Sequence, residues 1–246
     1  MDEIRKLIKH LLLFLAVIVI AGCATTKEAA NPQDPFETYN RAMFTFNTGV
    51  DKVIIRPVAK VYDTILPSPV KTGVDNFFSN LNEIPTVVNN LLQLDIGHAL
   101  AASWRLFFNT TIGIGGLFDV ATPFGLEKRR VDLGMTFTKW GANTPYLVLP
   151  ILGPSTVGDT VGLLAQYELF TVYPYIYPWY LRWSMLSLYF IEIRQQLLPT
   201  DKLVDEAFDP YVFVRDAYLQ HRKHMMNHDE EADDLLDDTF VEPTQS

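Results

Sequence analysis

The stretch that decides the fold is DPFETYNRAMFTFNTGVD, residues 34–51. Asp34 can cap a helix, Pro35 suits the first helical position, and Glu37 places a carboxylate in the first turn. Apolar side chains then follow at spacings of three and four residues, which is the period of one helix face. They are Phe36, Tyr39, Met43, Phe46 and Val50. The stretch therefore predicts an amphipathic helix that opens the folded domain.

Helix starts of the same kind recur along the chain. They stand at Ser68-Pro69, Pro85, Asp95, Pro178 and Asp209-Pro210. Apolar residues follow each start at helical spacing, and the helix from Pro178 to about Leu198 is expected to be the longest. Strand signals are weak, because the β-branched runs at 53–55 and 212–214 fit a helix as well as a strand. The expected fold class is all-α.

The first 23 residues have the layout of an export signal. A short basic start precedes an apolar run too short to span a bilayer of about 30 Å, and small residues precede Cys23. Cys23 is the only cysteine, so it cannot form a disulfide within the chain. The pattern resembles a bacterial lipobox, in which the cysteine is acylated; an ordinary signal peptide with a chance cysteine is the alternative. Ala24, in place of an aspartate, favours sorting to the outer membrane by resemblance to Gram-negative sorting rules.

Four segments are expected along the chain. Residues 1–22 are the signal peptide, 23–33 a small and polar tether that starts at the acylated cysteine, and 34–228 one helical domain. Residues 229–246 carry eight acidic groups and are expected to form a disordered tail.

The composition excludes some functions and suggests a membrane environment. Cleavage after residue 22 removes three of 20 Lys+Arg and two of 29 Asp+Glu, leaving a net charge of −10, which argues against nucleic-acid binding. Hydrophobic residues reach 48% and charged residues only 20%, below the quarter that is usual in globular domains. Yet Pro and Gly interrupt every later run that could span a bilayer. The mature chain therefore looks membrane-associated without having a transmembrane helix.

The strongest binding signal is aromatic. Ten Tyr, Trp and Phe residues lie between Tyr167 and Phe190, and this region is poor in charge. Aromatic residues at helical spacing often form the core of a soluble protein, but Tyr and Trp also concentrate at lipid head-group level. Together with the anchor and the prolines at 174 and 178, the pattern favours helices that lie within one leaflet. Loops at that depth need protein or a polar cavity beside them, so an enclosed polar cavity is expected.

No catalytic constellation emerges. Gly113-Ile114-Gly115-Gly116 lacks the full dinucleotide pattern and is interpreted as a turn or hinge between helices. A nucleophile elbow of the Gly-x-Ser-x-Gly type does not occur. His221, His224 and His228 have a spacing that could bind a metal, but an exposed helix end is the simpler interpretation. We therefore expect no enzyme activity, no cofactor and no metal.

The chain resembles the MlaA (VacJ) family of outer-membrane lipoproteins over residues 34–220. The motifs that carry the resemblance are Asp34-Pro35-Phe36-Glu37, Asn40-Arg41, Phe46-Asn47, Arg56-Pro57-Val58-Ala59, Asn76-Phe77-Phe78-Ser79-Asn80-Leu81, Arg105-Leu106-Phe107-Phe108-Asn109-Thr110-Thr111-Ile112-Gly113, Gly115-Gly116-Leu117-Phe118-Asp119, Pro145-Tyr146-Leu147-Val148-Leu149-Pro150 and Asp209-Pro210-Tyr211. Two stretches depart from the family pattern. Gly158-Asp159 stands where Arg-Asp is usual, and Val131-Asp132-Leu133-Gly134 stands where a Glu-Asp-Phe-Gly-like run is usual, so polar contacts at these positions cannot be carried over.

The resemblance implies a ring of amphipathic helices in the periplasmic leaflet of the outer membrane, with a central amphipathic channel. It implies that stray phospholipids are removed from the outer leaflet and passed to a soluble periplasmic lipid carrier (MlaC-like), which maintains lipid asymmetry. It also implies association with trimeric porins. An envelope phospholipase and a structural porin-assembly lipoprotein are the alternatives from other classes.

The candidate site residues fall into three groups. Cys23 carries the lipid anchor. The candidates for channel gating are Phe46, Asn47, Asp51, Gly113, Gly115 and Gly116. The candidates for membrane or porin contact are Tyr146, Leu149, Tyr173, Tyr175, Tyr177, Trp179 and Trp183.

Overall fold

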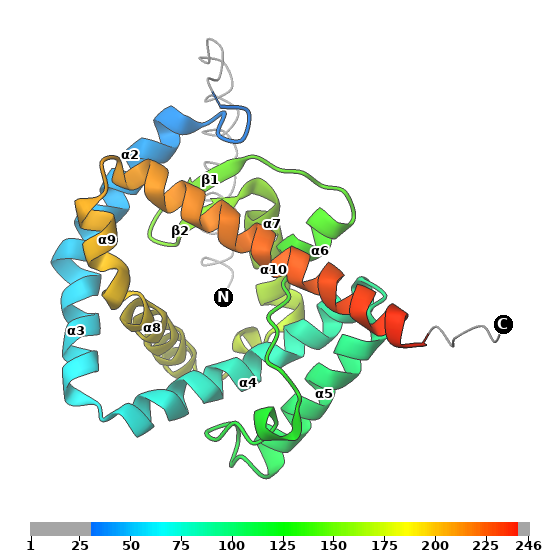
Figure 1. The fold of residues 1–246 in the computed structure, drawn as a ribbon. Coiled ribbons are helices and arrows are strands. Elements are labelled where there is room, and N and C mark those ends of the chain that lie inside the picture. Colours follow the sequence, from blue (N-terminus) through cyan, green and yellow to red (C-terminus); the bar gives the residue numbers. More distant parts are fainter. Residues whose placement is uncertain (1–30, 241–246) are drawn as a thin grey trace.

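The computed structural model describes residues 31–240, with side chains up to residue 226, so the signal peptide and Cys23 lie outside the described residues. Figure 1 shows helices arranged around a ring. The elements are α2 (Glu37–Val50), η1 (Asp51–Ile55), α3 (Arg56–Ile65), α4 (Ser68–Leu92), α5 (Ile96–Thr111), η2 (Thr122–Phe124), α6 (Leu133–Lys139), β1 (Tyr146–Leu149), β2 (Gly153–Thr156), α7 (Val157–Phe170), η3 (Tyr173–Tyr175), α8 (Trp179–Gln196), η4 (Leu198–Thr200), α9 (Asp201–Glu206) and α10 (Pro210–Phe240). The all-α prediction is confirmed, because the strands of this region form one short antiparallel hairpin.

The opening helix bends around one side of the ring. α2 continues through η1, a π-helical turn, into α3, so residues 53–55 are helical. Pro57 lies at the start of α3 and has no N–H to donate, and prolines and π-helical turns are both recognised causes of helix bending. The bend lets one continuous segment form a corner of the ring.

Asp34 closes the ring and does not cap α2. The helix begins at Glu37 without a side-chain cap, so the predicted role of Asp34 is wrong. Its carboxylate is buried and accepts hydrogen bonds from Asn40 Nδ2 (2.8 Å), from the Tyr211 hydroxyl and from Arg215 Nη1 (3.2 Å). The beginning of the domain is thereby joined to α10.

α4 is one helix of 25 residues that contains Pro85, so the predicted helix start at Pro85 is wrong. Proline removes a backbone hydrogen bond from a helix interior. The two halves nevertheless stay aligned, because buried polar side chains on both sides of Pro85 bind neighbouring elements. Asn80 Nδ2 donates to Thr110 on α5 (2.9 Å), and Asn89 Nδ2 donates to Gln166 on α7 (3.0 Å).

Four predicted helix starts are confirmed, and Ser68, which opens α4, is one of them. Asp95 Oδ1 accepts from the His98 N–H and caps α5, and Asp209 Oδ1 accepts from the N–H groups of Tyr211 and Val212 at the start of α10. Pro178 precedes α8, although α8 has 18 residues and is shorter than α4. Local capping chemistry locates the starts at Asp95 and Asp209, whereas α8 begins after Pro178 without a side-chain cap.

α10 extends well beyond the predicted end of the domain. It runs to Phe240 and so continues into the segment expected to form the tail; residues 241–246 lie outside the described part. The segment 230–236 contains Glu, Ala and Leu, which are strong helix formers, and this propensity explains the continuation.

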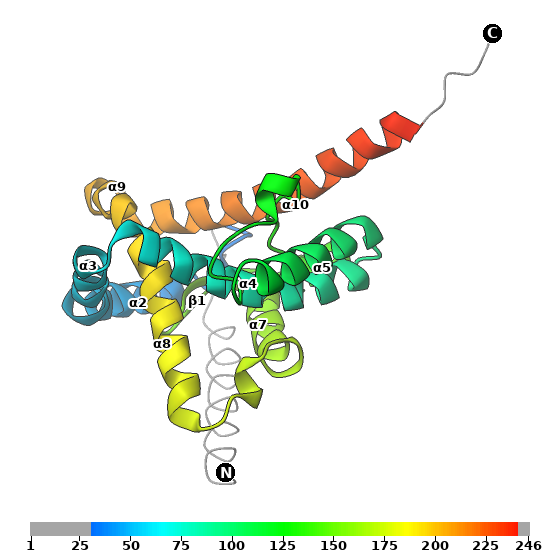
Figure 2. The same cartoon turned by 90° about the horizontal axis from the view of Figure 1, so that it is seen from below.

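The molecule consists of a flat layer and a projecting hairpin. Figure 2 shows α2, α3, α4 and α5 close to one layer, with α7 and α8 extending from it to one side and the far end of α10 rising to the other. The short 3-10 turn η3 lies between these two helices at the tip of the hairpin. This tip carries most of the aromatic residues of the 167–190 region.

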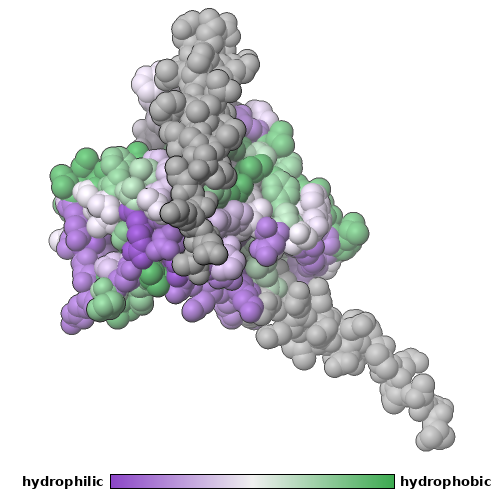
Figure 3. Space-filling model, turned by 90° about the horizontal axis from the view of Figure 1, so that it is seen from above, coloured by the Kyte–Doolittle hydropathy of each residue, from purple (hydrophilic) through white to green (hydrophobic). Residues whose placement is uncertain are grey.

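Burial is partly reversed relative to a soluble protein. Buried polar residues in the described region are as numerous as buried apolar ones, whereas many large apolar side chains of η1, α3, α5, α7 and α8 are exposed. Figure 3 shows hydrophobic residues gathered on the side toward which α7 and α8 extend, and hydrophilic residues on the side of α10. Exposed apolar surface of this extent marks a surface that contacts protein or lipid.

α6 and α7 cross at two glycines. A Cβ on Gly162 would lie 2.5 Å from the backbone nitrogen of Gly134, and a Cβ on Gly134 would lie 2.1 Å from Asp159 Oδ1. Both positions therefore need glycine, so that the two backbones can approach this closely.

We expect Gly162→Ala to destabilise the protein by about 1–3 kcal/mol, because the new methyl group overlaps backbone atoms. Gly49→Ala on α2 is the matched control: nothing lies within 4 Å of its Cβ, and alanine should stabilise the helix by up to about 1 kcal/mol. Thermal unfolding in detergent measures both. Equal midpoints for the two variants would contradict the packing argument.

Candidate lipid-handling site

Two asparagines on α2 hold the open edge of β1. Asn40 and Asn47 are seven helical residues apart, a rise of about 10.5 Å. Their partners Tyr146 and Leu149 are three strand residues apart, about 10.2 Å, so both asparagines can bind β1 at the same time. The bonds run from Asn40 to the Tyr146 carbonyl (3.1 Å), from the Val148 N–H to Asn40 (2.8 Å), from Asn47 to the Leu149 carbonyl (2.8 Å) and from the Ile151 N–H to Asn47 (2.7 Å). The gating candidate Asn47 thus fixes the end of the β-hairpin, and its neighbour Phe46 is half exposed.

Asp51 ties η1 to α8. It accepts hydrogen bonds from Arg194 Nε (2.7 Å) and Nη2 (2.9 Å) and from Arg56 Nε (3.1 Å). Arg194 also donates to Asp201 (2.7 Å) at the start of α9. Burial alone would raise the pKa of Asp51, but the two arginines outweigh it and lower that pKa. Asp51 is therefore a charged junction between three elements.

The glycine segment forms a tightly bonded turn after α5. A Cβ on Gly113 would lie 2.2 Å from the Phe118 carbonyl oxygen, and a Cβ on Gly116, whose φ is +90°, would lie 2.6 Å from Asn80 of α4. The side chain of Asn109 accepts from two N–H groups of the following loop, at 2.9 and 3.0 Å. Gly115 has φ +68° and faces open space. The interpretation as a turn is confirmed, and Figure 1 places this turn and η1 on different sides of the ring.

Four of the contact candidates form an exposed aromatic tip. Tyr175, Tyr177, Trp179 and Trp183 are 56–73% exposed, at and after η3. They belong to the projecting hairpin of Figure 2. Large exposed aromatic rings with polar edges suit the boundary between lipid and water.

The expectation of membrane or porin contact is wrong for Tyr146, Leu149 and Tyr173, which are only 1–5% exposed. Tyr146 forms the small core cluster with Val148 and Tyr211, and Leu149 lies on the same strand between α2 and β2. Tyr173 stacks on Tyr167 with ring planes 6° apart. The apolar run that contains Tyr146 and Leu149 was expected at the surface, but it forms the buried strand β1.

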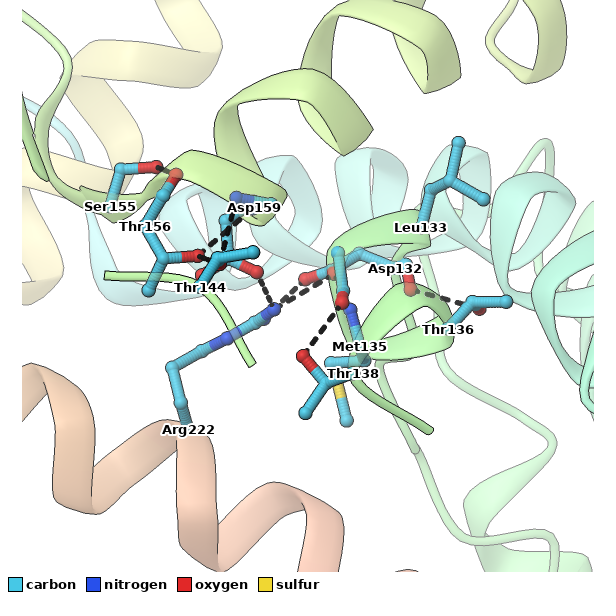
Figure 4. Close-up of polar contacts among 12 residues, drawn as sticks. Asp132, Leu133, Met135, Thr136, Thr138, Thr144, Ser155, Thr156, Asp159 and Arg222 are labelled. Atoms are coloured by element: carbon cyan, nitrogen blue, oxygen red, sulfur yellow. Dashed lines mark hydrogen bonds and ion pairs between the residues drawn. The ribbon is translucent and has the colours of Figure 1, made fainter. Parts of the chain in front are cut away.

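Arg222 of α10 joins the two stretches that depart from the family pattern. Figure 4 shows its guanidinium between Asp132, before α6, and Asp159, in the first turn of α7. Asp132 also caps α6 by accepting from the Met135 N–H (2.8 Å), and Tyr218 donates to Asp159 (2.6 Å). Burial and Asp159 raise the pKa of Tyr218, so this hydroxyl stays protonated. One arginine thereby fastens α10 to α6 and α7.

A second buried network was not foreseen. Arg105 of α5 donates to Glu83 of α4 (2.8 Å) and to Asp119 (3.1 Å), and both Arg105 and Glu83 are buried. Burial raises the pKa of Glu83 despite Arg105. Burial would also raise the pKa of Asp119, but hydrogen bonds from Thr122 and Arg105 lower it to about 2. Arg105 and Asp119 belong to the family motifs quoted above, but the sequence does not indicate that they pair with each other or with Glu83.

No group of three or more His, Cys, Asp or Glu in the described part could hold a metal ion. Among the described helices, none is both long and apolar enough to cross a membrane.

Comparisons with known proteins agree with this geometry. The family model described as MlaA lipoprotein matches residues 32–225. The intermembrane phospholipid transport system lipoprotein MlaA of Escherichia coli (strain K12) is 36% identical over 225 residues, covering 87% of each chain, and its Shigella flexneri counterpart has the same identity and coverage. An uncharacterized protein of Rickettsia prowazekii (strain Madrid E) is 38% identical over 80% of this chain and 79% of its own. A chain solved in a study of the structural basis for maintenance of bacterial outer membrane lipid asymmetry superposes with a TM-score of 0.70 and 35% identity, over 78% of this chain and 98% of its own.

We expect Asn47→Ala to release the end of the β-hairpin. The change removes the side-chain donor that binds the Leu149 carbonyl and the side-chain acceptor that binds the Ile151 N–H. The loss should be about 1–2 kcal/mol, with faster hydrogen exchange of the Ile151 amide. Thr45→Ala is the control, because Thr45 bonds only within α2. Unchanged exchange at Ile151 in Asn47→Ala would contradict the clamp.

Asp119 should make the free energy of unfolding depend on pH in the acid range. Its pKa of about 2 lies below the ordinary value of about 3.9, so its contribution is present above the ordinary value and is lost as pH falls toward the folded value. Asp119→Asn should therefore be less stable than the wild type at pH 7. Denaturant unfolding at a series of pH values should show this difference shrinking toward pH 2; a constant difference would contradict it.

Proposed function

Because the chain belongs to the MlaA lipoprotein family, we propose that it removes misplaced phospholipids from the outer leaflet of the outer membrane. It then passes them to a soluble periplasmic lipid carrier, which maintains lipid asymmetry. The observation that carries this proposal is the reversed burial: exposed apolar and aromatic surface on one side, and polar side chains inside the helical layer. A protein that moves amphiphiles needs both kinds of surface.

The membrane side of the proposal rests on the aromatic tip. Tyr175, Tyr177, Trp179 and Trp183 lie at a boundary between lipid and water, where the polar edges of their rings stay hydrated. Cys23 carries the acyl anchor and supplies targeting. Together the tip and the anchor hold the helical layer parallel to the membrane.

The transport side of the proposal needs a wet path for head groups and apolar walls for acyl tails. The ring encloses an amphipathic channel, and its access is controlled near Phe46, Asn47 and Asp51 and near the 113–116 turn. Covalent chemistry is unnecessary, so the protein is not an enzyme. Trimeric porins are the proposed neighbours in the membrane, through exposed apolar surface such as that of α3 and α5.

The test uses a Gram-negative strain deleted for its own homologue and complemented with this chain. Surface phosphatidylethanolamine is measured with a membrane-impermeant amine reagent. We expect accumulation in the deletion strain, full correction by the wild type, weak correction by Cys23→Ala, and reduced correction by the double variant Trp179→Ser/Trp183→Ser. Phe208→Ser is the control, because Phe208 is a fully exposed aromatic residue between α9 and α10, two elements that Figure 2 shows away from the hairpin tip.

Three outcomes would contradict the proposal. They are normal surface lipid in the deletion strain, release of fatty acid from vesicles by the purified protein, and disturbed porin trimers with normal surface lipid. The second would favour a phospholipase and the third a porin-assembly factor.

A further inference from the structure

A mixed-charge cluster lies where the segment between η2 and α6 meets α4 and α8. Figure 1 shows this segment crossing α4 and continuing inside the ring, where α8 also lies. We name this group the inner polar cluster. Its members are Asp75 and Ser79 of α4, Lys128 and Arg130 of the segment, and Glu192 and Gln196 of α8.

The two cations of the inner polar cluster share one carboxylate at long range. Lys128 Nζ lies 3.6 Å and Arg130 Nη2 3.8 Å from the oxygens of Asp75, distances beyond a normal hydrogen bond. Arg130 Nη2 also lies 3.3 Å from Ser79 Oγ. Both side chains are partly exposed, at 32% and 46%. Burial and the nearby Arg130 lower the pKa of Lys128, so an anion placed between the two cations would relieve their repulsion.

The buried carboxylate of the cluster, Glu192, is hydrogen-bonded to a neutral group. Glu192 is 3% exposed and accepts a hydrogen bond from the neutral amide of Gln196, which also donates to Asp75 (3.1 Å). No ion pair joins Glu192 to a cation among the described side chains. Burial and Asp75 raise the pKa of Glu192, although Gln196 and the charges of Arg130 and Lys128 act in the opposite direction. The nearby Tyr62 hydroxyl is buried without a hydrogen-bond partner, and its pKa is raised by burial, Glu192 and Asp75. A buried carboxylate is normally paired, so this position favours a cationic ligand group.

The other ionic networks of the protein differ in this respect. Arg105 with Glu83, Arg194 with Asp51, and Arg215 with Asp34 are joined by hydrogen bonds of 2.7–3.2 Å. Those pairs use their donors on one another and hold helices together. In the inner polar cluster, by contrast, the cations lie 3.6 and 3.8 Å from their carboxylate, and the buried Glu192 is bonded to a neutral amide.

We propose that the inner polar cluster binds the head group of an aminophospholipid, with Lys128 and Arg130 at the phosphate and Glu192 and Asp75 at the ammonium group. This inference rests on the proposed transport function and names its preferred substrate class. Two cations and two carboxylates match a neutral zwitterion, whereas an anionic glycerol head group would leave Glu192 uncompensated. A primary ammonium also offers three N–H donors to carboxylates and amides.

The test measures lipid bound to the purified full-length protein after incubation with mixed micelles of equal phosphatidylethanolamine and phosphatidylglycerol content. We expect the wild type to favour phosphatidylethanolamine, and Glu192→Gln to lower the bound ratio by about tenfold, as the loss of one charged hydrogen bond would. Arg130→Gln should weaken both lipids, because both carry the phosphate. The paired changes Lys202→Gln and Glu206→Gln are the control, since this pair is exposed on α9.

A wild-type ratio in a folded Glu192→Gln protein would overturn the head-group site. If Glu192→Gln fails to fold, as judged by thermal unfolding, Arg130→Gln decides: unchanged affinity for both lipids would overturn the site. Competition by soluble glycerophosphoethanolamine distinguishes recognition of the head group alone from recognition of the whole lipid. Absence of any bound lipid in the wild type would count against the proposed function itself.

Discussion

The structure depends on the buried carboxylate of Asp34. Helices arranged in a ring have no central core to hold them, so the ends of the chain must be joined by specific bonds. Asp34 accepts hydrogen bonds from Asn40, Tyr211 and Arg215, and thereby connects the start of the domain to α10. Because this charge is removed from water, losing a partner would leave it uncompensated. The small cluster of Tyr146, Val148 and Tyr211 packs beside this bond and adds the apolar part of the closure.

The same constraint explains why polar residues are inside. A flat ring that exposes its apolar side chains to lipid cannot use them to hold neighbouring helices together, because lipid and protein interiors are about equally apolar. Hydrogen bonds and ion pairs then supply the specificity: Asn47 fixes β1, Arg105 joins α4 to α5, and Arg222 joins α10 to α6 and α7. Where two helices must approach more closely, as α6 and α7 do, glycine allows it because it has no Cβ, as at Gly134 and Gly162.

The sequence predicts features that depend on neighbouring residues and misses those that depend on distant ones. The caps at Asp95 and Asp209 were found because the carboxylate and its backbone partners are at most three residues apart. Asp34 has the same local pattern, but Tyr211 and Arg215 compete for its carboxylate from the other end of the chain. The apolar runs of the candidate site were ambiguous in the same way, because their sequence does not tell an exposed run from a buried one. Trp179 at the tip is exposed and Tyr146 is buried. Only the packing of α2 and α10 decides which run is covered. The pairing of Arg222 with Asp132 and Asp159 carries no local signal at all.

A transporter also has to separate the bonds that hold its frame from those that hold its cargo. Frame bonds join oppositely charged side chains at hydrogen-bond distance, as in the pairs of Arg105, Arg194 and Arg215. A cargo site must keep binding capacity unused until the cargo arrives, and it must release the cargo again, so its internal contacts should be long and partly hydrated. Lys128 and Arg130 at 3.6 and 3.8 Å from Asp75 have that character, while Glu192 stays buried beside a neutral amide. The difference between short and long ionic contacts therefore separates, within one ring, the part that must stay closed from the part proposed to exchange lipid.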